Sequence, residues 1–202
     1  MKVTAIVGSY RKGGASDQAV DAILEGAREA GATVSKIYLI DRRMAFCANC
    51  RECMQEPGPE RGRCPIHDDV PAILDEIDAS DAVVLASPVN FGTVTAVMKQ
   101  FIERLGAYAY WPWGAPAPKP RRVPRTKRAV VVASSAAPAL LARFAMPIVG
   151  LLKKAADVMG ARTVGVLFIG LAAQYPGQPL DRKTLDRARR LGRKLVTGRT
   201  RP

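Results

Sequence analysis

Five short apolar runs, separated by segments with helical spacing, limit the fold of this 202-residue chain more than any other feature. The runs are rich in β-branched residues and lack a polar–apolar alternation, which is typical of strands buried on both faces of a parallel sheet. We expect strands at 2–7, 32–40, 82–86, 129–133 and 163–169. Strands that alternate with helices predict an α/β fold, with helices on both faces of the sheet and right-handed crossovers.

The connections between these runs carry apolar residues at helical spacing. The first helix is expected to begin near Ser16 or Asp17, either of which can cap free backbone N–H groups. Later helices are expected after Asp68-Asp69, after Gly92, over roughly 139–159 with a bend at Pro147, and over the basic stretch 182–201.

The loop after the first run, Gly8–Asp17, is rich in Gly, Ser and basic residues and leads into a helix. Backbone N–H groups and the helix dipole make such a junction a site for a phosphate, and Ser9, Ser16 and Arg11 can add donors. The loop matches neither the Walker pattern nor Gly-x-Gly-x-x-Gly. An ordinary strand-to-helix turn with a capped helix is the alternative. The loops after the first, third and fourth strands are expected to converge on one ligand.

All four cysteines (Cys47, Cys50, Cys53 and Cys64) lie in one irregular stretch that is rich in Pro and Gly, here termed the cysteine segment (41–66). No apolar run is long enough to span a bilayer, and the N-terminus has no signal-peptide pattern, so we expect a cytoplasmic location. In a reducing compartment, clustered cysteines indicate metal or redox chemistry more than structural disulfides.

A formal net charge of +13 places nucleic acid among the candidate partners. The excess is concentrated at 119–128 and 182–201, and no zinc-finger, helix-turn-helix or RNP pattern accompanies it. We therefore expect a solvated basic face, attractive to NADPH or an acidic electron donor, and no specific nucleic-acid or membrane partner.

A proline-rich excursion at about 107–127 carries Tyr108, Tyr110, Trp111 and Trp113. Aromatic residues are enriched in interfaces, so we expect a homodimer or homotetramer. The alternative is that these residues cover the protein's own core.

Three stretches together resemble the NAD(P)H-dependent FMN reductase family of the flavodoxin-like superfamily. They are the loop Gly8–Gly14, the sequence Ser87–Gly92, and Met98–Arg104. The cysteine pattern, followed by Asp68-Asp69, resembles the iron–sulfur flavoprotein branch of that family. The resemblance implies a three-layer fold with strand order 2-1-3-4-5. It also implies one FMN-binding domain over 1–202, in which the cysteine segment and the excursion are insertions.

Carried over by position, the resemblance implies that the FMN phosphate is held by the first loop, at Ser9, Arg11, Gly13, Gly14, Ala15, Ser16 and Asp17. The isoalloxazine ring would be lined by Pro88, Val89, Asn90, Phe91 and Gly92, with Ser134 and Ser135 at its other edge. Many relatives have Tyr where Asn90 stands, and Asn can neither stack nor offer a phenol. For Phe91, a core aromatic beneath the loop is the alternative to a flavin contact.

The four cysteines are candidate ligands of a [4Fe–4S] cluster, because thiolates at two-residue intervals can surround one face of a cluster. In the iron–sulfur flavoproteins the last cysteine follows a shorter gap, whereas ten residues separate Cys53 from Cys64 here. Free or disulfide-paired thiols are the equal alternative, and zinc is a weaker one. The nearby His67 is expected to be a surface or helix-capping residue rather than a ligand.

The resulting hypothesis is a flavoenzyme in which NAD(P)H reduces FMN, which passes electrons to a quinone, another small acceptor or a cluster. The flavin carries the chemistry, so no side chain is expected to act as a catalytic acid, base or nucleophile. Two alternatives are an electron carrier with protein redox partners and a basic nucleic-acid-binding protein with a vestigial flavin fold.

Overall fold

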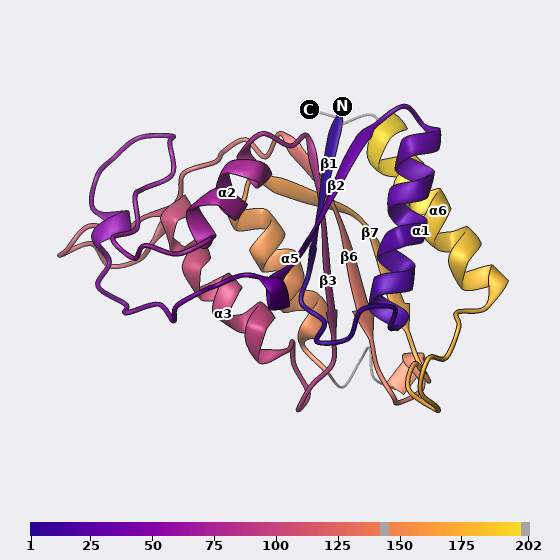
Figure 1. Cartoon of the computed structure of the whole chain (residues 1–202). Coiled ribbons are helices and arrows are strands. Elements are labelled where there is room, and N and C mark those ends of the chain that lie inside the picture. The colour runs from indigo at the N-terminus through magenta and orange to yellow at the C-terminus, as the bar shows by residue number, and fades with distance from the viewer. Residues whose placement is uncertain (142–145, 199–202) are drawn as a thin grey trace.

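The computed structural model describes residues 1–141 and 146–198, and within these residues the strands form one parallel sheet and one small hairpin. The parallel sheet has the order β2-β1-β3-β6-β7 (Figure 1). Its strands are β1 (Lys2–Val7), β2 (Thr33–Tyr38), β3 (Ala82–Pro88), β6 (Lys127–Ser134) and β7 (Ala161–Ile169). This confirms the predicted α/β class and the flavodoxin-like order of the five predicted strands.

Helices cover both faces of the sheet (Figure 1). One face is covered by α1 (Ala15–Glu29) and α6 (Arg182–Thr197), and the other by α2 (Val70–Asp78), α3 (Ala96–Arg104) and α5 (Ile148–Val158). Each layer has its own apolar core, because alternate side chains of every strand point to opposite sides of the sheet. Among the described residues, the helices include none that is long and apolar enough to cross a membrane.

Strands β3, β6 and β7 extend two residues or fewer beyond the expected bounds at either end, and three other boundaries differ from the expectations. The second strand ends at Tyr38, because residues Leu39–Asp41 turn into a 3₁₀ helix. The helix expected over 139–159 is not continuous at its middle: α5 starts at Ile148 with Pro147 as its N-cap, and 142–145 lie outside the described residues. The last helix ends at Thr197, and the end of the basic stretch, 199–201, also lies outside them.

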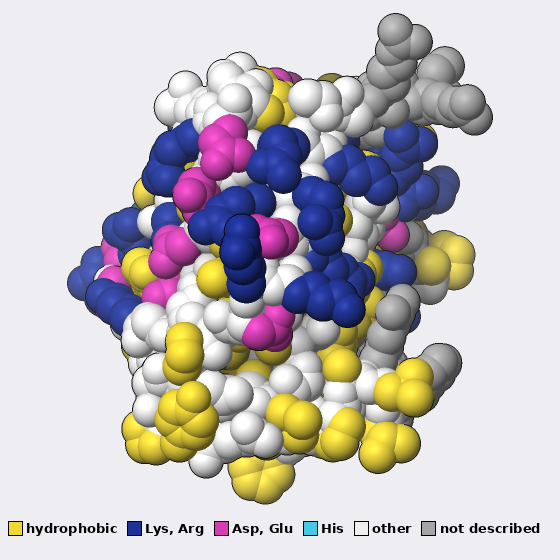
Figure 2. All heavy atoms as spheres, turned by 90° about the vertical axis from the view of Figure 1, so that its right-hand side faces the viewer, with side chains coloured by type: hydrophobic (Ala, Val, Ile, Leu, Met, Phe, Trp, Pro, Cys, Tyr) yellow, Lys and Arg dark blue, Asp and Glu magenta, His cyan; other side chains and the backbone are white. Residues whose placement is uncertain are grey.

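The outer helices α1 and α6 approach each other closely through two glycines. A Cβ atom on Gly26 would collide with the carbonyl of Arg189, and one on Gly192 with the carbonyl of Ile23. Ion pairs of Arg189 with Glu25 (2.9 Å) and of Arg193 with Glu29 (2.7 Å) flank this contact. Figure 2 shows basic side chains interleaved with acidic ones over this face. The basic helix is therefore partly neutralised by its neighbour.

The cysteine segment and the excursion lie together at the far edge of the molecule, on the left of Figure 1. Backbone bonds join them: Trp111 N–H donates to the Met54 carbonyl and Gly62 N–H to that of Ala107, both at 2.8 Å. A short hairpin of β4 (Ala109–Tyr110) and β5 (Lys119–Pro120) and 3₁₀ turns at Glu52–Met54 and Leu105–Tyr108 are their regular elements.

The aromatic residues of the excursion differ in burial and in the residues that they contact. Tyr108 is fully buried and donates to Asp78 (2.7 Å), so it belongs to the protein's own core. Trp113 is 66% exposed. Trp111 and Trp113 both stack on Arg51, whose guanidinium lies 3.7 and 4.3 Å from their ring centroids. The excursion thus packs against the cysteine segment through a cation–π contact.

Candidate functional site

The loops at the carboxyl ends of the sheet enclose a cavity of about 200 Å³, here termed the strand-end cavity. Loops after β1, β3 and β6 contribute, as expected, together with the chain after β7. The cavity is lined by Ser9, Tyr10, Arg11, Gly14, Ala15, Ser16, Pro88, Val89, Asn90, Ser134, Ser135, Ala136, Ala172 and Ala173. Ligands of open α/β sheets bind at this end, where the strand order reverses.

The N-terminus of α1 points its free backbone N–H groups at this cavity. Its N-cap residue is Gly14, which is extended and has no side chain to offer, and the N–H groups of residues 15–17 find no acceptor among the described residues. The expectation that Ser16 or Asp17 caps the helix is therefore wrong. The helix starts earlier because Gly13, at φ 75°, turns the chain one residue before the cap.

Buried serine hydroxyls tie the loops together around the cavity. Ser16 Oγ and Ser134 Oγ lie 2.7 Å apart, although 118 residues separate them in sequence. Ser9 Oγ lies 3.2 Å from the backbone nitrogen of Arg11 and 3.0 Å from its carbonyl oxygen. Free N–H groups at a helix N-terminus, with hydroxyls beside them, form a donor set suited to a phosphate.

The loop after β3 is fixed at both ends. Val89 N–H donates to the Ser134 carbonyl (2.7 Å), and Asn90 and Thr93 exchange backbone bonds at 2.9 and 3.0 Å. Thr95 caps α3 and its hydroxyl donates to the Gly8 carbonyl at 2.5 Å. These bonds hold the first and third loops at a set separation.

Four of the predicted cofactor residues do not line the strand-end cavity: Gly13, Asp17, Phe91 and Gly92. Asp17 is buried, accepts the N–H of Gly13 (2.6 Å) and pairs with Lys36. Burial disfavours the charged amine of Lys36, but its bonds to Asp17 and Asp21 outweigh this and raise its pKa. Asp17 thus braces the loop from behind. Gly13 lines a smaller neighbouring cavity of about 80 Å³.

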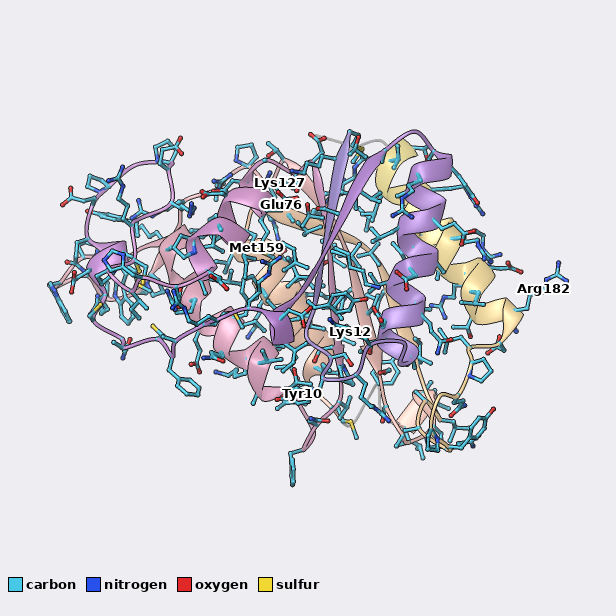
Figure 3. The ribbon with its side chains drawn as sticks, viewed as in Figure 1. Tyr10, Lys12, Glu76, Lys127, Met159 and Arg182 are labelled. Carbon is cyan, nitrogen blue, oxygen red and sulfur yellow. The ribbon has the colours of Figure 1, made fainter. Side chains whose placement is uncertain are left out.

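Phe91 stands at the tip of its loop with a left-handed φ of 46° and a fully exposed ring. The alternative of a core aromatic beneath the loop is therefore wrong. Sequence reasoning missed Tyr10, Ala136, Ala172 and Ala173, which also line the cavity. The position of Ala172 and Ala173 shortly after the fifth strand could have marked them as lining residues. Their alanine side chains could not, because they carry no polar group that indicates binding. Figure 3 shows Tyr10 at the lower end of the sheet, with Lys12 above it.

The four cysteines line one small cavity of about 20 Å³, and all four are free thiols. Within the described residues, no three His, Cys, Asp or Glu side chains are gathered closely enough to hold one metal ion. This disfavours zinc. Each iron of a [4Fe–4S] cluster takes one cysteine, so cluster ligands stand further apart than ligands of a single ion. The cavity has room for about one water, so a cluster would require these irregular loops to spread.

The backbone between the cysteines has a form associated with anions and clusters. Asn49 (φ 53°) and Arg51 (φ 61°) are both left-handed, although neither is Gly. A left-handed residue paired with a right-handed one turns successive N–H groups into one concavity in many phosphate and iron–sulfur sites, and Asn49 and Arg51 supply two left-handed positions here. The Asn49 N–H donates to Cys47 Sγ at 3.4 Å. Strained residues of this kind concentrate at functional sites.

Cys53 and Cys64 differ in their surroundings. Burial raises the pKa of the Cys53 thiol to about 11, and the neighbouring cysteines add to the rise. Cys64 Sγ instead lies 3.4 Å from Arg104 Nη2. Arg104 also donates to the Ala45 carbonyl (2.9 Å) and pairs with Asp68 at 2.6 Å, and the two paired side chains are only 1% and 3% exposed. The buried ion pair of Arg104 with Asp68 therefore positions a guanidinium N–H next to Cys64 Sγ.

Comparison with known proteins gives three findings. A sequence model described as NADPH-dependent FMN reductase matches residues 1–168. An iron-sulfur flavoprotein of Archaeoglobus fulgidus is 36% identical over 112 residues, which are 55% of this chain and 49% of that protein. One of Methanocaldococcus jannaschii is 38% identical over 104 residues, which are 52% and 51%. The chain thus spans about half the length of these curated relatives.

Solved structures show the same fold. An NAD(P)H:quinone oxidoreductase from Methanothermobacter marburgensis superposes with a TM-score of 0.67 at 23% identity, covering 96% of this chain and 98% of that one. A flavone reductase superposes at 0.68 with 18% identity, covering 97% and 62%. A flavodoxin from the domain Archaea superposes at 0.57 with 14% identity, covering 97% and 96%.

Proposed function

Because the chain belongs to the NADPH-dependent FMN reductase family, we propose that it is an FMN-dependent NAD(P)H oxidoreductase with FMN in the strand-end cavity. The observation that carries this proposal is the uncapped N-terminus of α1, which faces a cavity lined by buried serines. In this proposal residues 1–202 form one FMN-binding domain, with the cysteine segment and the excursion as insertions.

The chain's own residues would bind and orient the cofactor. The N–H groups of residues 15–17, with the hydroxyls of Ser9 and Ser16, donate to the phosphate, and Arg11 adds a positive charge. Pro88, Val89 and Asn90 border the ring on one side, with Ser134 and Ser135 at the other edge. The rest of the predicted set would have supporting roles: Asp17 and Gly13 shape the phosphate loop, and Phe91 and Gly92 form the tip of the loop after β3.

A cavity of about 200 Å³ is smaller than most cofactor sites. It would hold the phosphate and part of the flavin, and the exposed side chains of Tyr10 and Phe91 stand on the loops that border it. When bound, FMN supplies the hydride chemistry, taking two electrons from the nicotinamide and passing them to a quinone or another small acceptor.

The test is a purified, FMN-loaded protein mixed anaerobically with NADPH or NADH in a stopped-flow spectrometer. We expect the yellow flavin absorption to bleach within one turnover, and a quinone added next to restore it. Bound flavin that neither nucleotide bleaches would instead support the alternative of an electron carrier with protein partners. A protein that retains no FMN after incubation with a twofold excess would overturn the proposal.

The cysteine segment supports an extension of this function, in which Cys47, Cys50, Cys53 and Cys64 bind a [4Fe–4S] cluster. Its support is the shared cavity, the left-handed residues Asn49 and Arg51, and N–H donors to two of the four sulfurs. A cluster in the cysteine segment would convert electron pairs from the flavin into single electrons for a protein acceptor.

Anaerobic reconstitution with iron and sulfide tests this extension. We expect about four iron atoms per chain, a broad brown absorption, and loss of iron but not of FMN in Cys64→Ala. His67→Ala is the matched control, because His67 is exposed, lies close in sequence, and does not line the cysteine cavity. Fewer than one iron per chain in the unaltered protein would leave a plain FMN reductase.

The loops at the strand ends also support a homodimer or homotetramer. They expose Tyr10, Phe91, Leu140, Leu141, Leu171 and Tyr175, each at least 45% exposed. Figure 2 shows apolar side chains gathered along the lower edge of the molecule, below the charged band. A monomer in light scattering at micromolar concentration would contradict this. A cytoplasmic location and the absence of a specific nucleic-acid partner stay predictions.

A further inference from the structure

The excursion and α5 border a cavity of about 670 Å³, which is larger than the strand-end cavity and is here termed the excursion cavity. It is lined by Ala109, Pro118, Lys119, Pro120, Arg122, Val123, Pro124, Arg125, Lys154, Asp157 and Val158. No lining residue is shared with the strand-end cavity. Its walls precede β6 and β7, so it lies towards the opposite end of the sheet. In Figure 3, Lys127 and Met159, which lie within two residues of this lining in sequence, are far from Tyr10.

The walls of the excursion cavity are apolar and preformed. Three of the lining residues are prolines, and Val123 is 72% exposed, which leaves apolar surface uncovered at the cavity. Prolines restrict the backbone before any ligand arrives, so less conformational entropy is lost on binding. A volume of this size lies in the range of small-molecule sites.

The charged groups of the excursion cavity are four cations and one carboxylate. Two of the cations are committed: Arg122 pairs with Asp78 (2.9 Å) and Arg125 with Asp157 (2.5 Å). Lys119, on β5, and Lys154, on α5, have no partner among the described residues. Two free ammonium groups therefore stand on different walls of an apolar cavity.

We propose that the excursion cavity binds a small amphipathic anion, with an apolar body between the prolines and Val123 and a carboxylate or sulfonate held by Lys119 and Lys154. Charge complementarity selects the anion, and the apolar walls select against simple inorganic ions. The site is separate from the flavin and does not rest on the proposed redox function.

The test uses FMN-saturated protein and the fluorescent probe 8-anilinonaphthalene-1-sulfonate, which combines a sulfonate with an apolar ring system. We expect about one equivalent to bind, to be displaced by decanoate, and not to be displaced by 1-decanol at equal concentration. Lys119→Glu combined with Lys154→Glu should weaken probe binding about tenfold or more, because both charge-assisted contacts are lost. Val123→Ser, at an exposed position, should weaken it severalfold with the charges intact.

The matched control is Lys153→Glu combined with Lys183→Glu, which changes the net charge equally at two exposed lysines outside this cavity. This pair should bind the probe as the unaltered protein does. Three results would overturn the proposal. They are equal binding by all variants, equal weakening in the control pair, and probe binding that disappears on FMN saturation. A change of molecular mass in Lys119→Glu/Lys154→Glu by light scattering would instead assign this face to a second copy of the chain.

Discussion

The strand-end cavity and the cysteine segment, which carry the proposed chemistry, are held by different kinds of contact. Around the cavity, backbone bonds continue the pairing of the sheet into the loops: Gly8 donates to Ala86 (2.8 Å), Val89 to Ser134 (2.7 Å) and Ser135 to Ile169 (2.8 Å). These bonds use groups that every non-proline residue possesses. The paths of these loops therefore rest mainly on backbone bonds, to which the hydroxyls of Ser16, Ser134 and Thr95 add side-chain contacts.

The cysteine segment is held mainly by three arginines. Arg104 donates a hydrogen bond to the carbonyl of Ala45, and Arg51 donates one to that of Trp111. Arg121 donates to the carbonyls of Glu56 (2.7 Å) and Gly58 (3.0 Å). A guanidinium offers five donors in a rigid fork, so one side chain can fix several turns of an irregular loop. The strand-end cavity thus depends mainly on backbone pairing, whereas the conformation of the cysteine segment depends on a few particular arginine side chains.

Among the variants that test this difference between the cavity and the cysteine segment, Arg104→Met is expected to have the largest effect on stability. It leaves the Asp68 carboxylate buried without its partner, so we expect a loss of about 3–5 kcal/mol in the free energy of unfolding. Urea denaturation measures this loss. Lys99→Met is the control, because Lys99 pairs with Glu103 on an exposed surface and should cost about 0–1 kcal/mol. Equal losses in the two variants would contradict the special role of Arg104.

The same ion pair predicts a dependence of stability on pH. Burial opposes ionisation of Asp68, but its bonds from Arg104, Ala45 N–H and Val70 N–H prevail and lower its pKa. The stabilisation is therefore complete above the ordinary pKa of Asp, about 3.9, and is lost as the pH falls through the lowered value. Arg104→Met should lack this acid-dependent component.

An intermediate effect is expected at the strand-end cavity from Arg11→Ala combined with Ser16→Ala. Each lost bond to the phosphate should cost about 1.5–3 kcal/mol, so the two losses together should raise the dissociation constant of FMN at least about a hundredfold. Iron bound by the cysteine segment should not change. Isothermal titration of the apoprotein with FMN checks the first point. An unchanged FMN affinity would contradict the proposal that this loop binds the phosphate.

The smallest effect is expected from Phe91→Ala. Because this ring is fully exposed, its removal should change the free energy of unfolding by less than about 0.5 kcal/mol. Thermal unfolding of the apoprotein tests this expectation. Loss of more than about 1 kcal/mol would show that the ring is covered in solution, and a change of molecular mass in the variant would identify a second copy as the cover.

Sequence patterns predicted the parts of the molecule that depend on backbone periodicity. Continuous apolar runs such as 129–133, alternating with helical segments, favour a parallel sheet buried on both faces, which then determines where the loops meet. The start of α1 was misassigned because it depends on the φ of Gly13, which composition does not reveal. The pairing of Arg104 with Asp68 could not be predicted, because the pattern of α3 contains no information about the irregular segment that packs on it.

The glycine contact between α1 and α6 has a consequence for how the protein matures during synthesis. Glu25 and its partner Arg189 are 164 residues apart, so the ribosome releases the covering helix long after the helix it covers. Until then, the outer surface of α1 around Gly26 is bare, and a partly exposed helix frays more readily than one packed on both sides. We therefore expect α1 to gain its full packing only after α6 has left the ribosome.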